Sequence, residues 1–132
     1  MKPIYLVCGV PCSGKTWVCS QLTDKFNYIP HDNYTVETYS TVLLNAAQTS
    51  DKPIIAEAPF RVSILLNELR QKGLTVHEYY IVEDLNIVTQ RYLQRTGKPY
   101  PKAFVTNWKK YAQREPRFAS VHLLHYLRSL NA

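Results

Sequence analysis

The residues with the clearest chemical potential lie near the start of the chain, where residues 9–16 read G-V-P-C-S-G-K-T. The spacing G-x-x-x-x-G-K-T is that of a phosphate-binding loop, or P-loop, whose two glycines let successive backbone N–H groups point at phosphate oxygens. We expect Lys15 to neutralise charge on the β- and γ-phosphates and Thr16 to offer its hydroxyl to Mg²⁺. The residues expected to bind the nucleotide are Gly9, Pro11, Cys12, Ser13, Gly14, Lys15 and Thr16. The motif therefore predicts binding of ATP, or another nucleoside triphosphate, together with Mg²⁺.

The sequence on both sides of the P-loop fits this interpretation. The apolar run at 4–8 is typical of a buried strand, and Val18, Leu22 and Phe26 are spaced to share one face of a helix. The alternative is a glycine turn that binds no nucleotide. The strand before the motif and the helix after it favour the nucleotide site.

Short apolar runs alternate with longer helical patterns along the rest of the chain, which is typical of an α/β fold. Since 132 residues leave room for one core, we expect a single P-loop NTPase-like domain over 1–132. Further strands are expected at 28–30, 53–57 and 74–82, and helices at 17–26, 34–48, around 64–69, at 84–95, around 104–111 and around 121–127. These elements predict a parallel sheet of about four to five strands flanked by helices, although no fifth strand can be recognised.

Two carboxylates come at the ends of predicted strands, Asp32 after the second and Glu57 at the end of the third. Because parallel strands end at one edge of a sheet, we expect both beside the P-loop. Asp32 is expected to act as the general base that accepts the proton of an attacking hydroxyl; alternatively, it caps the following helix. Glu57, or Asp32, could contact Mg²⁺ through water. Glu57 could instead hold a lid arginine, or lie on the surface just past the sheet edge.

Arg91 and Arg95 are four residues apart, and therefore on one helix face, just before a loop rich in glycine and proline. We expect residues 91–101 to form a basic lid that brings both arginines to the transferring phosphate. A solvated basic face is the alternative. Arg61, near the start of a helix, is a further candidate for binding the substrate.

The charge of the chain is distributed unevenly. The formal net charge is +6, but residues 1–90 carry seven Lys/Arg and nine Asp/Glu (net −2), whereas residues 91–132 carry nine Lys/Arg and one acid (net +8). A cationic C-terminal third indicates a polyanionic partner, nucleic acid above all, or else a face that is simply solvated.

Three cysteines, Cys8, Cys12 and Cys19, lie close together without the spacing of a zinc site, so we expect free thiols. No apolar run approaches the roughly 20 residues of a membrane span, and the start of the chain lacks a signal-peptide pattern. We therefore expect a cytoplasmic protein that does not bind membranes.

Taken together, these motifs resemble the 5′-kinase domain of the bacteriophage polynucleotide kinase family, over nearly the whole chain. The resemblance rests on the P-loop, Asp32, the strand end I-I-A-E-A at 54–58 and the run R-x-x-x-R-T-G-K-x-x-P at 91–101. It implies that Lys15 and Thr16 bind ATP and Mg²⁺, that Asp32 activates the acceptor hydroxyl, that Arg95 stabilises the transferring phosphoryl group and that Glu57 positions this arginine.

The chain departs from that family at two positions. Thr35 stands where the family has an arginine that contacts substrate phosphate, and Glu57 replaces an aspartate. Either Arg61 replaces the missing arginine or the acceptor differs. Asp32, Arg61 and Thr35 are thus the candidate substrate-binding residues.

Three functions remain open on the sequence. The leading one is an ATP- and Mg²⁺-dependent kinase acting on a polynucleotide hydroxyl, at a 5′ end or on a modified base. The second is a kinase for a nucleotide, nucleoside or other small molecule. The third is a nucleic-acid-binding NTPase without a phosphate acceptor.

Overall fold

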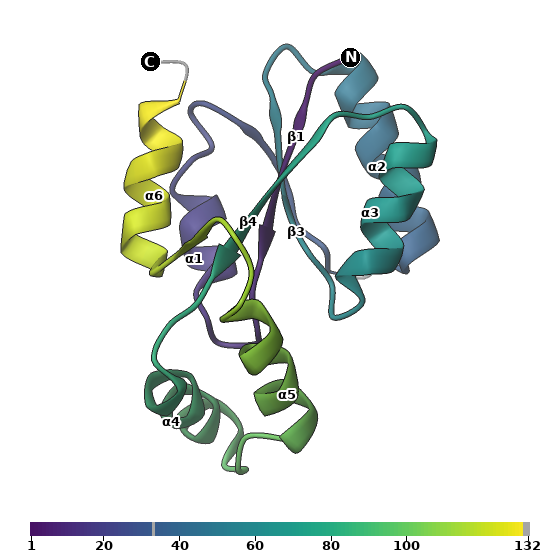
Figure 1. The fold of residues 1–132 in the computed structure, drawn as a ribbon. Helices are drawn as coiled ribbons and strands as arrows, with labels where there is room; N and C mark the ends of the chain where they lie inside the picture. Colours follow the sequence, from purple (N-terminus) through teal and green to yellow (C-terminus); the bar gives the residue numbers. More distant parts are fainter. Residues whose placement is uncertain (33, 131–132) are drawn as a thin grey trace.

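The fold is built on a five-stranded parallel sheet, seen in a computed structural model that describes residues 1–32 and 34–130 (Figure 1). In sequence order the strands are β1 (Ile4–Cys8), β2 (Asn27–Ile29), β3 (Ile54–Glu57), β4 (Val76–Ile81) and β5 (Arg117–Phe118). Their order in the sheet is β2-β3-β1-β4-β5. The P-loop strand β1 is therefore central, between β3 and β4, which places the loop after β1 at the middle of the carboxyl edge.

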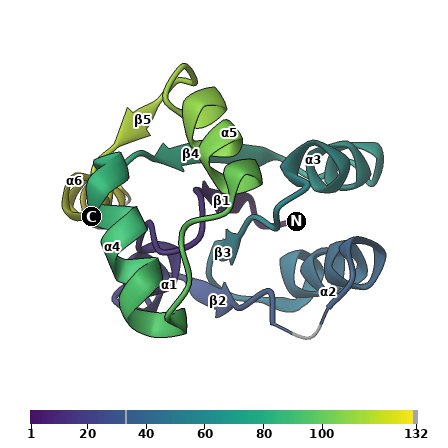
Figure 2. The same ribbon diagram turned by 90° about the horizontal axis from the view of Figure 1, so that it is seen from below.

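Helices cover both faces of the sheet and its carboxyl edge. They are α1 (Lys15–Ser20), α2 (Val36–Thr49), α3 (Val62–Gln71), α4 (Leu85–Thr96), α5 (Lys102–Tyr111) and α6 (Ser120–Ser129). Helices α2 and α3 pack side by side on one face, and α1 and α6 on the other (Figures 1 and 2). Helices α4 and α5 lie at the carboxyl edge, towards the viewer in Figure 2. Helices α4 and α5 therefore cover the end of the sheet at which the P-loop follows β1.

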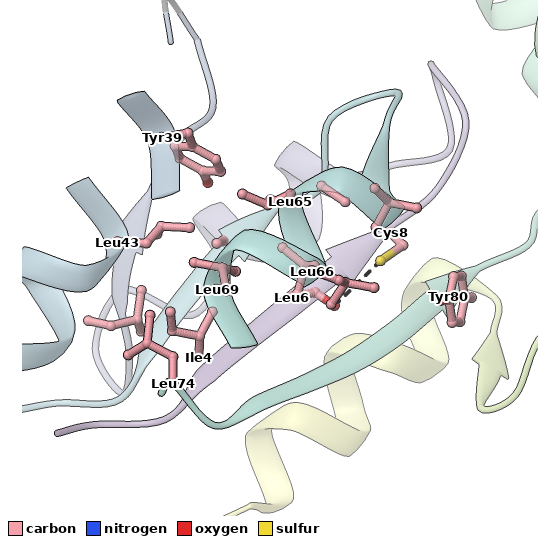
Figure 3. Close-up of a cluster of buried hydrophobic side chains, with 14 of the residues drawn as sticks. Ile4, Leu6, Cys8, Tyr39, Leu43, Leu65, Leu66, Leu69, Leu74 and Tyr80 are labelled. Carbon is pink, nitrogen blue, oxygen red and sulfur yellow. Dashed lines mark hydrogen bonds between the residues drawn. The ribbon is translucent and has the colours of Figure 1, made fainter. Parts of the chain in front are cut away.

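The core has two parts because alternate residues of a strand point to opposite faces. Ile4, Leu6 and Cys8 of β1 face α2 and α3, whereas Tyr5 and Val7 face α1 and α6. Figure 3 shows the first part, in which the Cys8 thiol donates to the Leu6 carbonyl and is buried with the apolar side chains. Burial raises the pKa of the Cys8 thiol, so this cysteine is a core residue rather than a reactive one.

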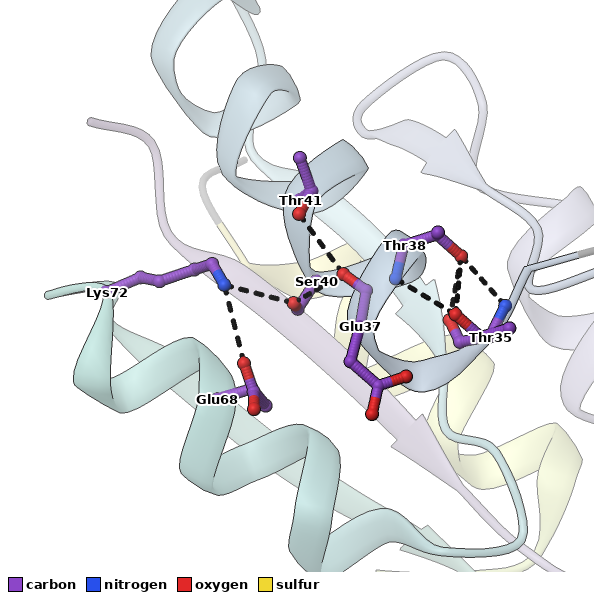
Figure 4. A network of polar contacts seen from close by, with 7 residues as sticks. All are labelled: Thr35, Glu37, Thr38, Ser40, Thr41, Glu68 and Lys72. Carbon is purple, nitrogen blue, oxygen red and sulfur yellow. Dashed lines mark hydrogen bonds and ion pairs between the residues drawn. The ribbon is translucent and has the colours of Figure 1, made fainter.

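The α2–α3 contact combines an apolar stripe with a small polar seam. Helix α3 buries the stripe Val62, Leu65, Leu66 and Leu69 at the i, i+3, i+4, i+7 spacing of one helix face. Beside it, Lys72 Nζ donates to the buried Ser40 hydroxyl at 3.2 Å and to Glu68 at 3.4 Å (Figure 4). The Lys72–Glu68 pair lies within the end of α3, and only the hydrogen bond to Ser40 crosses to α2, so the apolar stripe accounts for most of the contact between the two helices.

The α/β class, the parallel sheet and the first four strands are confirmed, with differences at two places. The fifth strand, β5, escaped recognition because it has two residues and pairs only along the edge of β4. Helix α1 ends at Ser20 rather than Phe26, although Leu22 and Phe26 are buried as expected. In the described residues, no helix is long and apolar enough to cross a membrane. The apolar pattern therefore predicted burial better than it predicted helix length.

The α3 stripe leads to a stability prediction. Leu69→Ala removes a fully buried side chain and should lower the free energy of unfolding by about 2–5 kcal/mol. Ile64→Ala, on the same helix but 44% exposed, should cost less than about 1 kcal/mol. Urea denaturation followed by circular dichroism measures both; equal losses would contradict the assignment of the buried face.

Candidate active site

The P-loop has the tight backbone that its glycines permit. Gly14 has φ +102° and Cys12 has φ +69°, both in the left-handed region. A Cβ on Gly9 would clash with the Ser13 hydroxyl and lie 3.3 Å from the Ile81 carbonyl oxygen, so a larger residue there requires its neighbours to move. The Ser13 hydroxyl itself is buried without a hydrogen-bond partner in the described part of the chain. The loop is therefore tightly folded and encloses the unpaired Ser13 hydroxyl.

Lys15 is folded back against the backbone of the site. Its ammonium group donates to the Gly9 carbonyl at 2.7 Å and to the Ala58 carbonyl at 3.4 Å. Burial lowers the pKa of Lys15, and the nearby Glu57 carboxylate acts in the opposite direction. A partly buried ammonium that donates to two carbonyls has a third donor free, which suits an anionic ligand at the loop.

Glu57 is the buried carboxylate at the centre of the site, only 7% exposed. It accepts hydrogen bonds from the Thr16 hydroxyl at 2.5 Å and from the Tyr28 hydroxyl at 2.8 Å. Its backbone N–H donates to the Tyr39 hydroxyl at 3.2 Å, and Tyr39 donates in turn to the Ile29 carbonyl at 2.6 Å. Burial, followed by the Glu57 contact, raises the pKa of Tyr28, which stays a neutral donor. The carboxylate is thus held by α1 and β2, and the backbone of the same residue by α2.

The pair of Thr16 and Glu57 fits a magnesium ion. Mg²⁺ prefers hard oxygen ligands, and P-loop proteins supply them from the loop hydroxyl and a carboxylate at the end of a neighbouring strand. Here the two side-chain oxygens are 2.5 Å apart and both come from the carboxyl edge. No group of three or more His, Cys, Asp or Glu residues forms a metal cluster within the described ranges, so these residues could hold Mg²⁺ only with help from water and phosphate.

The segment predicted as a lid touches the P-loop directly. Arg91 donates to the Cys12 carbonyl at 3.0 Å, and Arg95 donates to the Cys12 sulfur at 3.5 Å. The Tyr100 hydroxyl donates to the Pro11 carbonyl at 2.8 Å. Arg95 therefore lies against the loop and not against Glu57, whose partners are Thr16 and Tyr28. The structure shows these contacts in a single arrangement, and lid motion stays a prediction.

Three cavities surround the loop. One of about 370 Å³ lies between the loop, α4 and the start of α6. A smaller one of about 110 Å³ follows the loop itself and reaches Arg95. On the opposite side, a cavity of about 270 Å³ is lined by Lys15, Thr16, His31, Asp32, Glu57, Ala58, Pro59 and Phe60. We call this third one the β2–β3 cavity. The loop thus separates two spaces, one on the α6 side and one on the side of Asp32.

Asp32 lies where the sequence predicted it, in the wall of the β2–β3 cavity, and its side chain is exposed. The alternative that it caps helix α2 is wrong: the N-cap is Thr35, whose hydroxyl accepts from the Thr38 N–H at 3.1 Å. Thr35 therefore has a structural role at the helix start. Arg61 is the exposed residue before α3 and is not part of the cavity wall, so the structure does not bring it to the site.

The sequence did not predict the contacts that four residues make at the site. They are Tyr28 and Tyr39, which fix Glu57, Tyr100, which binds the loop, and His31, which lines the β2–β3 cavity. The chain has ten tyrosines, and no sequence spacing distinguishes these three as residues of the site. For His31, its position next to Asp32 was the only sequence feature that could have indicated a place in the site.

Comparisons with known proteins agree with this geometry at the level of fold. No protein-family model matches the chain, and no curated protein does. Among solved structures, the tunicamycin resistance protein of Deinococcus radiodurans is similar with a TM-score of 0.72 and 17% identity, covering 96% of this chain and 94% of that chain. A sugar kinase from Janibacter sp. HTCC2649 has a TM-score of 0.63 and 15% identity, covering 96% and 92%.

A de novo designed protein with the P-loop NTPase fold is also similar, with a TM-score of 0.51 and 12% identity over 98% of this chain and 95% of that chain. At such identities the likeness concerns the fold alone. The fold and the loop together define the chain as a P-loop NTPase-fold protein, and kinases are among the proteins that share this fold.

The fit of Gly9 against Ser13 can be tested. Gly9→Ala brings a methyl group against the Ser13 hydroxyl and within 3.2 Å of the Ser13 Cβ, so the Ser13 side chain must rotate and its neighbours must move by a few tenths of an ångström. The affinity for ADP·Mg²⁺, measured by calorimetry, should fall by about tenfold or more. Gly73→Ala is the control: Gly73 lies at φ +79° with nothing near its would-be Cβ, so the substitution should cost about 1 kcal/mol of stability but leave ADP affinity unchanged. Unchanged ADP binding by Gly9→Ala would contradict the role of this contact.

Proposed function

We propose that this chain is an ATP- and Mg²⁺-dependent kinase that transfers the γ-phosphoryl group to a hydroxyl. The observation that carries the proposal is the placement of the P-loop between two spaces. The cavity on the α6 side has room for the base of a nucleotide, while the β2–β3 cavity has room for a second substrate beside Asp32. An NTPase that uses water needs no second cavity, so this geometry favours a kinase over the NTPase alternative.

Each part of the site has a role in that reaction. Lys15 and the loop N–H groups would bind the β- and γ-phosphates, and the Thr16–Glu57 pair would hold Mg²⁺. When bound, Mg²⁺ neutralises charge that develops on the phosphate oxygens. The acceptor oxygen forms a bond to the γ-phosphorus, the bond to the bridging oxygen of ADP breaks, and the acceptor proton passes to the Asp32 carboxylate. Arg91 and Arg95, already at Cys12, stabilise the transferring group.

The finer part of the proposal is that the acceptor hydroxyl belongs to a polynucleotide. Helix α5 borders the β2–β3 cavity, because Phe104 packs on Phe60 with ring centroids 5.9 Å apart. The α4–α5 segment carries exposed lysines with no side-chain partner in the described residues, namely Lys98, Lys102, Lys109 and Lys110. Exposed cations on the segment that contacts Phe60 suit a chain of phosphates better than a neutral small molecule.

A small-molecule acceptor is the second candidate, favoured by the size of the cavity. Its volume of about 270 Å³ lies near the lower end of small-molecule sites, and one solved neighbour is a sugar kinase. In that case the exposed lysines are a solvated surface only.

Transfer of label from [γ-³²P]ATP tests the kinase proposal. The acceptor panel contains 5′-hydroxyl DNA and RNA, hydroxymethylated duplex DNA, free nucleosides and simple sugars. Asp32→Asn should lower kcat by about 10²–10⁴-fold with unchanged ATP binding, because only the proton acceptor is lost. Lys15→Ala should lose ATP binding as well, whereas Asp51→Asn, an exposed carboxylate away from the site, should behave as wild type. Hydrolysis of ATP without transfer to any acceptor would support the NTPase alternative instead.

Ionic strength separates the two acceptor classes. A polynucleotide that contacts several lysines releases counterions on binding, so its KM should rise steeply between low and physiological salt. The KM of a neutral nucleoside or sugar should change little. Lys109→Gln with Lys110→Gln should weaken the salt dependence for DNA or RNA; no change would assign these lysines to a solvated face.

A further inference from the structure

Trp17 is an exposed aromatic residue that directly follows the P-loop. It lies in the first turn of α1 and is 44% exposed, whereas the next two residues, Val18 and Cys19, are fully buried. A single apolar residue on a protein surface needs no special explanation, but Trp17 lines two of the three cavities around the loop. What the indole contacts there depends on how the two cavities are related.

The two cavities share part of their walls. The smaller one, of about 110 Å³, follows the P-loop, and the larger one, of about 370 Å³, lies on the α6 side. Gly14, Trp17 and Arg95 line both. In the proposed site the phosphates occupy the smaller cavity, because the P-loop backbone forms its wall. The rest of the nucleotide then extends past the three shared residues into the larger cavity.

The walls of the larger cavity suit a flat heteroaromatic ring. They come from α1, α4 and α6, which lie on the same side of the molecule (Figures 1 and 2). Val121 on α6 is 47% exposed and lines this cavity with Trp17, so two exposed apolar side chains meet the same space. Arg91 and Arg95 add two guanidinium groups from α4. Indole faces and guanidinium planes are both surfaces on which nucleobases stack.

The α6 wall of this cavity is fixed by contacts of its own. The Glu83 carboxylate accepts hydrogen bonds from the Ser120 N–H at 2.9 Å and from the Ser120 hydroxyl. The Glu83 carbonyl accepts from the Trp108 indole N–H at 2.8 Å, which ties the same residue to α5. A Cβ on Gly14 would lie 3.2 Å from the Ser120 Cβ, so the start of α6 lies directly against the loop. The wall opposite the solvent is therefore in place before a nucleotide binds.

We propose that Trp17 is the base-binding residue of the nucleotide site and stacks on the ring of a purine nucleotide in the cavity on the α6 side. This inference rests on the proposed nucleotide site and assigns the recognition of its base. The indole has two fused rings, as a purine has, so ADP and GDP gain more contact area than CDP does. Stacking uses the face of a base and not its edge, so the contact with Trp17 does not distinguish adenine from guanine.

Calorimetric titrations with ADP·Mg²⁺ and tripolyphosphate·Mg²⁺ separate the base from the phosphates. Trp17→Ala should weaken ADP binding by about tenfold or more and leave tripolyphosphate binding unchanged, because only the base loses a contact. Trp17→Phe keeps an aromatic face and should recover part of the loss, whereas Trp17→Leu, which is apolar but not aromatic, should not. Wild type should bind ADP and GDP severalfold more tightly than CDP, and Trp17→Ala should bind the three about equally.

The chain offers a matched control in Tyr126. It is an exposed aromatic residue of α6, 40% exposed, and lines neither cavity. Tyr126→Ala should leave the affinity for ADP unchanged. If Trp17→Ala binds ADP like Tyr126→Ala, or weakens ADP and tripolyphosphate to the same extent, the proposal is overturned; in the second case Trp17 supports the loop and not the base.

Fluorescence gives a second reading of the same contact. The chain has two tryptophans, so Trp108→Phe leaves Trp17 as the sole indole. Its emission should change on addition of ADP·Mg²⁺ or GDP·Mg²⁺ and stay constant with tripolyphosphate·Mg²⁺, because only a nucleotide brings a ring to the indole. ADP binding seen by calorimetry without a change in emission would show that the base lies elsewhere.

These measurements need no phosphate transfer, which keeps them distinct from the test of the kinase function. ADP binding that depends on Trp17, in a protein that transfers phosphate to no acceptor, would contradict the kinase function and support the role of Trp17. Transfer by Trp17→Ala with the wild-type KM for ATP would overturn the role of Trp17 and leave the kinase function standing. Failure of the wild type to bind any nucleotide would overturn both.

Discussion

The arrangement of this site depends on one buried carboxylate, that of Glu57, and on the hydrogen bonds that hold it. A charge at 7% exposure is costly unless donors surround it, and Thr16 and Tyr28 supply them at 2.5 and 2.8 Å. The parallel pairing of β1 with β3 places Val7 opposite Glu57, so the carboxylate emerges at the level where the P-loop begins. The loop hydroxyl, the proposed metal position and the wall of the β2–β3 cavity all follow from that register.

The carboxyl edge carries the unfavourable features of the fold, and the rest of the domain offsets them. In the described part of the chain, the side-chain atoms that are buried without a partner are Ser13 Oγ and His31 Nε2, and both belong to this edge. The left-handed backbone at Cys12 lies there as well. The opposite end of the sheet and the α2–α3 layer are packed with apolar side chains. Local strain and unpaired polar groups therefore concentrate at the edge where ligands are expected to bind.

The cationic C-terminal third divides into groups with different surroundings. Arg91 and Arg95 both contact Cys12 of the loop. Arg114 lies over the Tyr80 ring and Arg117 pairs with Glu115, so part of the charge is committed within the chain. The exposed lysines of the α4–α5 segment remain, beside the aromatic contact of Phe60 and Phe104. Net charge alone therefore overstated the surface that is free to meet a polyanion.

The sequence by itself determined the P-loop, the α/β class and the edge at which Asp32 and Glu57 meet, because these depend on local residue types and on the rule that parallel strands end together. Tertiary structure alone decided which side chains complete the site. Tyr28 and Tyr39 reach Glu57 across about twenty to thirty residues of chain, and Tyr100 reaches Pro11 across nearly ninety. The two-residue strand β5 and the burial of His31 likewise arise from packing between distant segments. A pattern of neighbouring residues records local conformation, whereas these contacts exist only once the sheet has brought remote parts of the chain together.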